Sequence, residues 1–436
     1  MQTILKYGAI GDGKTLNTTA IQAAIDAVAE SGGGTLLVPP GHYVTGTLVL
    51  KNNLTLRLEP GAVIVGSSNP DDYPPTTFHH HLFGYVNCLL YAFDGENIRL
   101  TGDGVIDFNH EAFMDFTRPY PGRNATFDGM NERQIGEAPV TPGKRPRLPL
   151  FFHHCKHVRV DGLRLINSPC WTVTASCCQD VKIESLTIDN NLLAPNNDCV
   201  HICGSQDVVI RGCVFSAADD CIAVTGITDS SFVADRIVIS DCTMRARSSA
   251  IRLGHFDGKV QNVVISNITA YECNRGLSIF SGDGGWVENV RATNLVMQTQ
   301  IYAGGWWGKG EPAVICAIGE SARIANICLS NIEARSENSI TLIGQAGNVR
   351  DISLIDWRLR LRAGWNRPVY GSTLDLAPFN EVQIEVENGE TTRIPWLHAR
   401  EVNGLYMRNV RAEIEPEETA ELDISPIQLD VTLRED

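Results

Sequence analysis

The chain has 436 residues, enough for two or three average domains, although one long all-β domain can reach the same length. Hydrophobic residues make up 43% and charged residues 20%, which are ordinary globular values and argue against a disordered or fibrous chain. The formal net charge of −15 disfavours nucleic acid or an anionic membrane as a partner, because both require a basic face.

The N-terminal segment contains the only strong helical pattern. A glycine-rich turn at Gly8–Gly13 precedes a predicted helix from about Thr18 to Ser31, which Thr18 or Thr19 can cap and Gly32-Gly33-Gly34 ends. Its apolar stripe consists of Ile21, Ala24, Ile25 and Val28. We expect residues 1–40 to form an N-terminal cap that protects the exposed edge of the β-structure behind it.

Short β-runs of the Val/Ile-x-Ile/Val type then repeat almost to the C-terminus. They start at Val158, Val181, Val208, Ile237, Val263, Val290, Ile327 and Val349, at intervals of 23, 27, 29, 26, 27, 37 and 22 residues, several of them after an asparagine or aspartate. An interval in the twenties is typical of one coil of a parallel β-helix, whereas a β-sandwich turns back every ~8–12 residues. The sequence predicts one all-β domain over residues 1–436, with the last coils and a C-terminal tail in 365–436.

Three acids stand at corresponding points of this repeat. Asp198 precedes Asp219 and its neighbour Asp220 by 21 residues, close to one coil, so we expect them on adjacent rungs ~4.8 Å apart. Carboxylates this close raise the pKa of at least one member and so supply a protonated acid. Each aspartate alone is as compatible with a simple turn, but three at one coil spacing favour the paired-carboxylate cleavage of a glycosidic bond.

Several motifs resemble glycoside hydrolase family 28, the polygalacturonase-like enzymes. The resemblance runs from about Gly8 to Asn348 and includes Tyr7–Gly13, Val38–Gly41, Asn167–Trp171, Asn196-Asn197-Asp198 and Asp219–Val224. It implies a single-stranded, right-handed parallel β-helix of the pectate-lyase-like type, with Asp219 as general acid. It also implies that Asp198 and Asp220 hold and deprotonate the attacking water, with inversion. Spacing alone leaves inverting and retaining geometries open.

Two departures from the family pattern concern the substrate. The histidine of the family's Gly-His-Gly falls at Ser248, and the Arg and Lys of its Arg-Ile-Lys fall at Ser278 and Phe280. The cations expected to hold a galacturonate carboxylate are therefore missing. Either the substrate lacks that carboxylate or other cations replace them, and the candidates are Arg252, His255 and Lys309. By strand alternation Arg252 shares a face with Ser248.

The longest interval holds the segment Gly304–Pro312, which predicts a sugar-binding loop. Aromatic faces stack on sugar rings, so Trp306 and Trp307 are candidate substrate contacts, together with Lys309 and Glu311. The alternative is that a tryptophan fills a gap between coils. The inserts with His79–His81 and Tyr120–Arg123 are long enough to wall the cleft and so to make the enzyme exo-acting.

Other polar residues near the acids permit two interpretations. Asn196 opens the Asn-Asn-Asp triplet and His201 follows Asp198 by three residues, so both are candidate substrate-binding residues, although His201 can equally be a packed neutral histidine. We expect Trp171, one coil earlier, to support the site. His153-His154 is interpreted as structural, because no acidic or cysteine partner is identifiable in the sequence.

The cysteines and the N-terminus bear on compartment and cofactors. The 13 cysteines are scattered, with one adjacent pair at Cys177-Cys178, and are interpreted as buried thiols of a reducing compartment. No secretion signal or apolar run of ~20 residues is evident, which predicts a cytoplasmic protein unless a signal was removed. No metal-ligand spacing is present, so no metal or cofactor is expected.

These observations leave three functions to compare. The favoured one is a glycoside hydrolase acting on a plant-type, pectin-related carbohydrate and shifted from plain polygalacturonate. The second is a noncatalytic carbohydrate-binding or structural β-helix, which would have no reason to keep all three acids. The third is a lyase, which needs calcium and a basic residue, and no separate acidic calcium cluster is evident.

Overall fold

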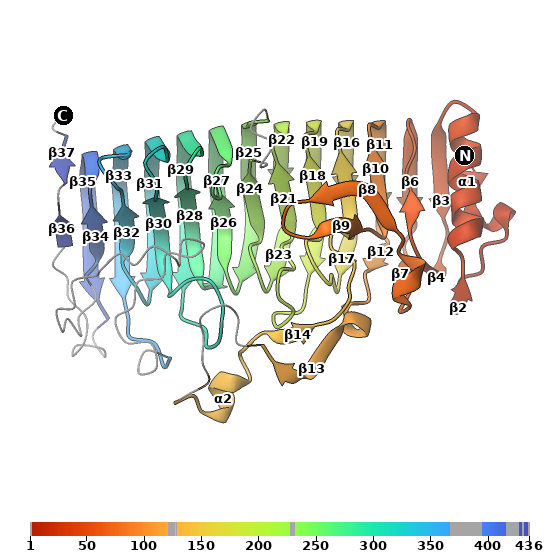
Figure 1. The fold of residues 1–436 in the computed structure, drawn as a ribbon, viewed down its shortest axis with the longest axis horizontal. Helices are drawn as coiled ribbons and strands as arrows, with labels where there is room; N and C mark the ends of the chain where they lie inside the picture. Colours follow the sequence, from red (N-terminus) through yellow and green to blue (C-terminus); the bar gives the residue numbers. More distant parts are fainter. Residues whose placement is uncertain are drawn as a thin grey trace. The chain divides into compact units, whose positions relative to one another are not determined.

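The predicted right-handed parallel β-helix is confirmed. The structure is a computed structural model that describes residues 2–120, 127, 129–226, 232–366, 395–415, 427–429 and 431–434 (Figure 1). Two compact units can be distinguished, a first unit of Met1–Arg118 with Val140–Ala218, and a second unit of Pro119–Pro139 with Asp219–Asp436. Whether residues 1–436 form a single domain stays a prediction.

The first unit consists of three stacks of parallel strands, here called A, B and C. Stack A contains β1 (Gln2–Thr3), β3 (Gly34–Val38), β6 (Leu54–Leu58), β11 (Glu96–Gly102), β16 (Lys156–Asp161), β19 (Gln179–Glu184) and β22 (Gln206–Arg211). Stack B contains β2 (Asp12–Leu16), β4 (Gly41–Thr45), β7 (Ala62–Gly66), β12 (Val105–Asp107), β17 (Arg164–Ile166), β20 (Thr187–Asp189) and β23 (Val214–Ala217). Stack C contains β5 (Leu48–Val49), β10 (Leu90–Phe93), β15 (Leu150–His153), β18 (Val173–Ser176) and β21 (Val200–Cys203).

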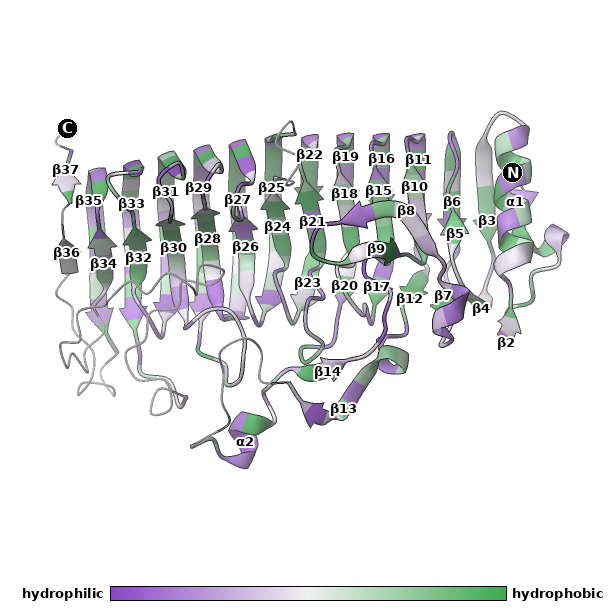
Figure 2. Ribbon diagram, viewed as in Figure 1, coloured by the Kyte–Doolittle hydropathy of each residue, from purple (hydrophilic) through white to green (hydrophobic). Residues whose placement is uncertain are grey.

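The predicted N-terminal helix is confirmed as α1 (Thr18–Glu30). Its buried residues are the predicted stripe, Ile21, Ala24, Ile25 and Val28, and the helix contacts β3, β5 and β6 at the start of the first unit. Figure 2 shows apolar and polar residues on different sides of this helix. The N-cap is Asn17 rather than a threonine, and its side-chain oxygen accepts from the Ile10 N–H in the preceding glycine turn. The helix thus covers apolar side chains that the first coil would otherwise expose to water.

The second unit consists of two stacks, D and E, in which each coil gives one long and one short strand. Stack D contains β25 (Ala234–Ala246), β27 (Lys259–Cys273), β29 (Trp286–Thr299), β31 (Arg323–Ser336), β33 (Val349–Leu361), β35 (Val402–Ile414) and β37 (Thr432–Leu433). Stack E contains β24 (Ile222–Thr225), β26 (Ser249–Leu253), β28 (Arg275–Ser281), β30 (Glu311–Ala317), β32 (Ile340–Ile343), β34 (Leu397–Arg400) and β36 (Ile427–Leu429).

Strand register confirms most of the predicted repeat. Val158 pairs with Val181 and Val181 with Val208 in the first unit, and Val263 pairs with Val290 and Val290 with Ile327 in the second. The last predicted step was wrong by three residues, because Val349 pairs with Ile324 and the partner of Ile327 is Ile352. In these rungs side chains alternate between a buried core and the surface.

The asparagines before the strand runs have a structural cause. Asn262, Asn289 and Asn326 all have φ near +55°, a left-handed conformation that asparagine tolerates. Their side chains bond from coil to coil, with Asn289 Nδ2 donating to Asn262 Oδ1 at 3.2 Å and Asn326 Nδ2 to Asn289 Oδ1 at 2.8 Å. Stacking of equivalent turns therefore selects asparagine at this point of the repeat.

The remaining elements are short. They are η1 (Ile4–Tyr7), η2 (Pro70–Asp72), β8 (Pro75–His80), β9 (Gly84–Asn87), η3 (His110–Phe113), β13 (Met114–Pro119), α2 (Glu132–Ile135) and β14 (Val140–Pro142). Strands β8 and β9 form an antiparallel hairpin. Within the described residues, none of the helices has the length and apolar character needed to span a bilayer.

Candidate active site

Asp198 stands two residues before the start of β21 and is almost completely buried. Its own carbonyl accepts from the Thr172 N–H at 2.8 Å, which holds it to the preceding coil. Its neighbour Asn197 is fully buried, donates to Asn191 O and accepts from the Ala218 N–H at 2.7 Å. These bonds hold the backbone at Asp198 in place, so the fold fixes the point from which its side chain starts.

His201 lies beside this acid. Its Nδ1 is 3.1 Å from Asp198 Oδ2, and its ring stacks on Trp171 with centroids 3.6 Å apart. Trp171 also receives the edges of His80 and Phe83 from the hairpin region. Burial, followed by the nearby histidines, lowers the pKa of His80 to about 3, so its ring is neutral. His201 is therefore a packed histidine in contact with a candidate catalytic acid, and its predicted contact with substrate stays a prediction. Trp171 lies beside the site through its stack with His201.

Arg145 is a buried residue beside the candidate site that sequence reasoning did not single out. It is buried, and its guanidinium donates to the carbonyls of Pro169 and Pro195 and, at 2.9 Å, to Asn196 Oδ1. Asn196 itself has φ +61° and turns the chain into Asp198. In the structure the side-chain oxygen of Asn196 thus serves the turn, and its predicted contact with substrate stays a prediction.

Asp219 and Asp220 stand just ahead of β24 in the second unit, separated from the strand by Cys221. Asp220 is fully buried, and its N–H donates to Asp219 Oδ1 at 3.0 Å. One oxygen of Asp220 accepts from Ser248 Oγ at 2.8 Å and from the Ser249 N–H at 2.9 Å, and the other accepts from Arg252 Nε. Each oxygen of this buried carboxylate thus has a donor.

These donors determine the charge of Asp220. Burial by itself would raise the pKa of the carboxyl, but the Arg252 guanidinium and the hydrogen bonds from Ser249 and Ser248 outweigh it and hold the pKa below its ordinary value. Asp220 is therefore ionised at neutral pH. For this member of the predicted triplet the shift is downward, so it is not the protonated acid that mutual repulsion was expected to supply.

Arg252 lies on β26 and shares a face with Ser248, as strand alternation predicted, because both side chains bind Asp220. Its guanidinium binds Asp220 and donates to Gly254 O at 3.2 Å. Ser248, at the position of the family's histidine, binds the same carboxylate. In this structure Arg252 is thus the partner of a candidate catalytic acid, and a contact between Arg252 and a substrate carboxylate stays a prediction. His255 lies beyond the end of β26, half-buried, with its ring edge-on to Phe256.

The predicted loop between β29 and β30 is held down by Trp306. The Trp306 side chain is buried, and its indole N–H donates to Glu137 O at 2.7 Å. Glu137 Oε2 accepts from the Ala303 N–H and from Asn366, which also binds Ile301 O. Trp306 therefore has the structural role that was the alternative to a substrate contact, because its side chain packs inside the protein. Trp307 is only half-buried and keeps more surface for a sugar ring.

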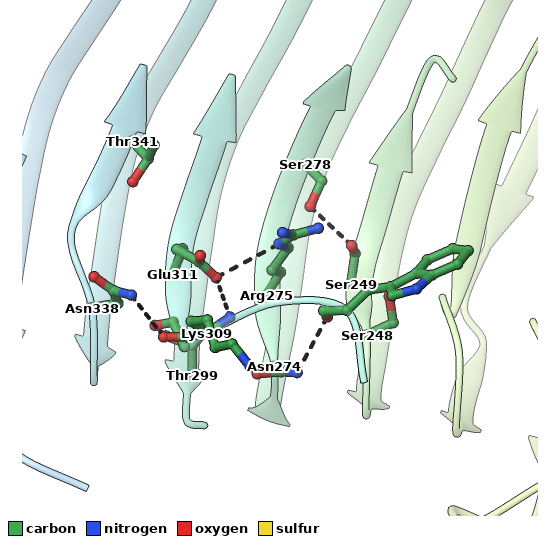
Figure 3. A network of polar contacts seen from close by, with 12 residues as sticks. Ser248, Ser249, Asn274, Arg275, Ser278, Thr299, Lys309, Glu311, Asn338 and Thr341 are labelled. Atoms are coloured by element: carbon green, nitrogen blue, oxygen red, sulfur yellow. Dashed lines mark hydrogen bonds and ion pairs between the residues drawn. The ribbon is translucent and has the colours of Figure 1, made fainter. Parts of the chain in front are cut away.

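Glu311 and Lys309 also support the loop. Glu311 is fully buried at the start of β30, 3.6 Å from Arg275 Nε, and accepts from the Lys309 N–H at 2.7 Å (Figure 3). The Lys309 carbonyl accepts from Asn338. The Glu311 carboxylate thus holds the loop through the Lys309 N–H. The predicted direct contact of Glu311 with a sugar stays a prediction. The half-buried Lys309 side chain is still a candidate.

The positions of the family's Arg and Lys are closed. Ser278 and Phe280 on β28 are fully buried, and the Ser278 and Ser249 hydroxyls lie 2.9 Å apart (Figure 3). Phe280 packs in an apolar cluster with Val314, Cys316 and Ile343. Neither position presents a group that could bind a carboxylate from solvent.

The inserts predicted to wall the cleft are only partly described. His79, His80 and His81 lie at the end of β8 and just after it, and the His80 ring stacks on His81 and meets Trp171. Tyr120 is exposed, whereas Pro121, Gly122 and Arg123 lie outside the described residues. The first insert therefore reaches the surroundings of Asp198 through Trp171 and His201.

The fold places the protein among the parallel β-helix proteins. It is similar to an exopolygalacturonase from Thermotoga maritima (TM-score 0.65, 23% identity, 82% of this chain and 86% of that one). It is also similar to a family 28 exopolygalacturonase from Yersinia enterocolitica (TM-score 0.69, 22% identity, 99% and 77%).

The sequence defines the family more closely. The model for glycosyl hydrolases family 28 matches residues 125–359, and the chain belongs to that family. Residues 2–73 match the "Rhamnogalacturonase A/epimerase, pectate lyase-like" model.

Curated relatives include a probable polygalacturonase from Vitis vinifera, 26% identical over 71% of this chain, and an exo-poly-alpha-D-galacturonosidase from Dickeya chrysanthemi, 30% identical over 50%. The matches cover 62% and 41% of the length of those two relatives.

Proposed function

We propose that this protein is a glycoside hydrolase that cleaves a pectin-related carbohydrate through Asp198, Asp219 and Asp220. Membership of family 28 supports the reaction class. The observation that carries the proposal is the environment of Asp220, a fully buried carboxylate whose donors keep it ionised. A buried, ionised carboxylate beside a second acid is the arrangement that acid–base cleavage of a glycosidic bond requires.

The coil spacing of the sequence led us to expect the three acids at one cleft, and in this proposal they act together on the substrate. In the first unit the Ala218 N–H donates to Asn197 Oδ1, and these residues directly precede Asp219 and Asp198 in the sequence. Asp220 and Asp198 then hold and deprotonate the attacking water, and Asp219 protonates the departing oxygen. The lowered pKa of Asp220 favours the role of a base over that of an acid. Water attack opposite the leaving group inverts the anomeric carbon.

The substrate is a pectin-related chain cleaved from one end and differing from plain polygalacturonate. Exo-action is supported by the names of similar proteins, an exo-poly-alpha-D-galacturonosidase and two exopolygalacturonases. The loop anchored by Trp306 over the buried Arg275 and Glu311 fits a closed subsite in the second unit. The buried Ser278 and Phe280 argue for a sugar that is not held by its carboxylate at that point.

A substrate panel tests the reaction and the acid together. The protein is incubated with oligogalacturonates and with rhamnose-, arabinose- and galactose-containing pectic oligosaccharides, and products are followed by chromatography and their anomeric form by NMR. We expect inversion, and a rate that falls ~10²–10⁴-fold in Asp219→Asn. The matched control is Asp103→Asn, at an exposed position. Full activity of Asp219→Asn would refute this assignment of the acid.

A noncatalytic carbohydrate-binding β-helix is the alternative that the same panel addresses. It predicts binding by titration calorimetry without any product, in the unmodified protein as in Asp219→Asn. The cytoplasmic location also stays a proposal, and cell fractionation with an antibody against the protein tests it.

A further inference from the structure

Three side chains stand in line where strands of stack C end. Phe93, His153 and Ser176 are register partners on β10, β15 and β18, so the residues that follow them, Asp94, His154 and Cys177, occupy equivalent positions of consecutive coils. All three have φ +52°, the left-handed conformation of a tight turn. The fold therefore brings together an acid, a histidine and a cysteine that are far apart in sequence.

The chemistry of this group matches a metal site. His153, His154 and Cys177 each offer a ligand atom, and these atoms lie within 4.8 Å of one another. Asp94 Oδ1 lies 3.6 Å from His154 Nδ1, which adds an oxygen ligand at the edge of the group. Imidazole nitrogen, thiolate sulfur and carboxylate oxygen together form a ligand set of divalent zinc.

One ligand is already oriented by an outer contact. His153 Nδ1 is 3.2 Å from Ser176 Oγ, and where this contact is kept in the metal-bound protein, Nε2 is the nitrogen that would bind the ion. Metal-binding histidines usually make such a bond through their other ring nitrogen. The His153 and His154 rings stack with centroids 4.0 Å apart. In this nearly parallel arrangement the nitrogens of the two rings do not point toward a common metal position. The His154 side chain is 42% exposed, so it can turn from the stack toward Cys177.

We propose that His153, His154 and Cys177, with Asp94 as an additional ligand, form a binding site for a divalent transition-metal ion of the zinc type. Bound there, the ion would join three consecutive coils of the first unit and stabilise the folded chain, because it binds only when the coils are stacked. The site is separate from Asp198, since Asp198 precedes its strand in stack C and Cys177 follows its own.

This proposal differs from the interpretation of the sequence. The sequence shows no identifiable acidic or cysteine partner for the His153-His154 pair and so predicts a structural role for it. The partners come from neighbouring coils, with Cys177 one coil after His154 and Asp94 one coil before it. The sequence hid Asp94 in particular, because the interval between Asp94 and His154 is far longer than one repeat.

Cobalt(II) is the probe that tests the site, because a cysteine thiolate bound to Co²⁺ gives a near-ultraviolet charge-transfer band that carboxylates do not give. The metal-stripped, reduced protein is titrated with Co²⁺ and then with competing Zn²⁺. We expect one thiolate-bound Co²⁺ per chain, displaced by Zn²⁺, with affinity at least ~10-fold lower in His154→Ala and the band lost in Cys177→Ser. Cys328→Ser is the matched control, because Cys328 is the other cysteine that is not fully buried.

Thermal unfolding gives an independent readout. Zn²⁺ should raise the melting temperature of the unmodified protein and of Cys328→Ser, and leave that of Cys177→Ser unchanged. Circular dichroism of each variant without metal checks that its fold is intact. Absence of the charge-transfer band, or an unchanged band in Cys177→Ser, would overturn the proposal. Hydrolytic activity is not part of either readout, so the outcome is independent of the proposed function.

Discussion

At the scale of single residues, Asp220 shows how burial and charge combine in this protein. A buried carboxyl without partners would have a raised pKa, but the guanidinium of Arg252 and the donors from Ser248 and Ser249 reverse the direction. Strand alternation predicted that Arg252 and Ser248 share a face. The sequence could not show that both side chains would bind Asp220, because that depends on which coil lies beside β26.

Replacing Arg252 tests this environment. In Arg252→Gln the opposite charge disappears, so the pKa of Asp220 should rise toward or above its ordinary value of 3.8. If Asp220 acts as a base, the acid limb of the pH–rate profile moves to higher pH. The folded state should lose roughly 3–5 kcal/mol, the usual cost of leaving one partner of a buried ion pair alone. Steady-state kinetics from pH 3 to 8 and denaturant unfolding measure the two effects.

Two comparisons sharpen that prediction. Arg252→Lys keeps a charge and should move the acid limb less, while Ser248→Ala removes one hydrogen bond to the charged group and should cost about 1.5–3 kcal/mol. The lowered pKa of Asp220 gives stability that is present above pH 3.8 and is lost as the pH falls through the folded-state pKa, so Arg252→Gln should flatten this dependence. An acid limb that stays in place would contradict the role of Asp220 as a base.

At the scale of elements, the loop between β29 and β30 contains one tryptophan that packs inside the protein, Trp306, and one that keeps exposed surface, Trp307. The sequence predicted the loop from its glycines and tryptophans but could not say which tryptophan faces inward. That choice depends on the carbonyl of Glu137, more than 160 residues earlier, which takes the Trp306 N–H. Gly304 is required by the same packing, since a Cβ there would lie 2.8 Å from the Ala138 Cα.

The two tryptophans should therefore respond differently to truncation. Trp306→Ala removes a buried side chain and should destabilise the protein by roughly 3–5 kcal/mol. Trp307→Ala, at a half-buried position, should cost much less stability and raise KM if the indole stacks on sugar. Chemical denaturation and initial-rate kinetics on the same two variants separate the effects, and equal stability losses would contradict the assignment.

The buried pair of Arg275 and Glu311 is a second test at this scale. Each residue is almost fully buried, so Glu311→Gln leaves the Arg275 charge without its carboxylate and should cost roughly 3–5 kcal/mol. The double variant Arg275→Met with Glu311→Gln should lose less than the sum of the single variants, because it removes both charges. Urea unfolding of the four proteins gives the coupling energy, and simple additivity would show that the pair does not act as a unit.

At the scale of the whole molecule, the repeat made the fold predictable. Val/Ile runs that recur at intervals of twenty to thirty residues can bury their apolar side only when the coils stack. The coils, the capping helix and the long loop could therefore be inferred from the sequence. The register of the final step was missed because β33 contains apolar residues at both Val349 and Ile352, and only pairing decides between them. Contacts between coils of unequal length, such as Arg145 with Asn196 or Asp94 with His154, leave no periodic signal.

The mode of cleavage can be tested on the whole protein. If the loop held by Trp306 closes one end of the substrate site, long pectic chains should be shortened from their ends. Reducing ends should then accumulate while the viscosity falls slowly, with small products of uniform size from the first minutes. Trp306→Ala should loosen the loop and yield a wider range of product lengths, whereas Cys328→Ser should not. A rapid fall in viscosity with the unmodified protein would show internal cleavage and would place the closed end elsewhere than at this loop.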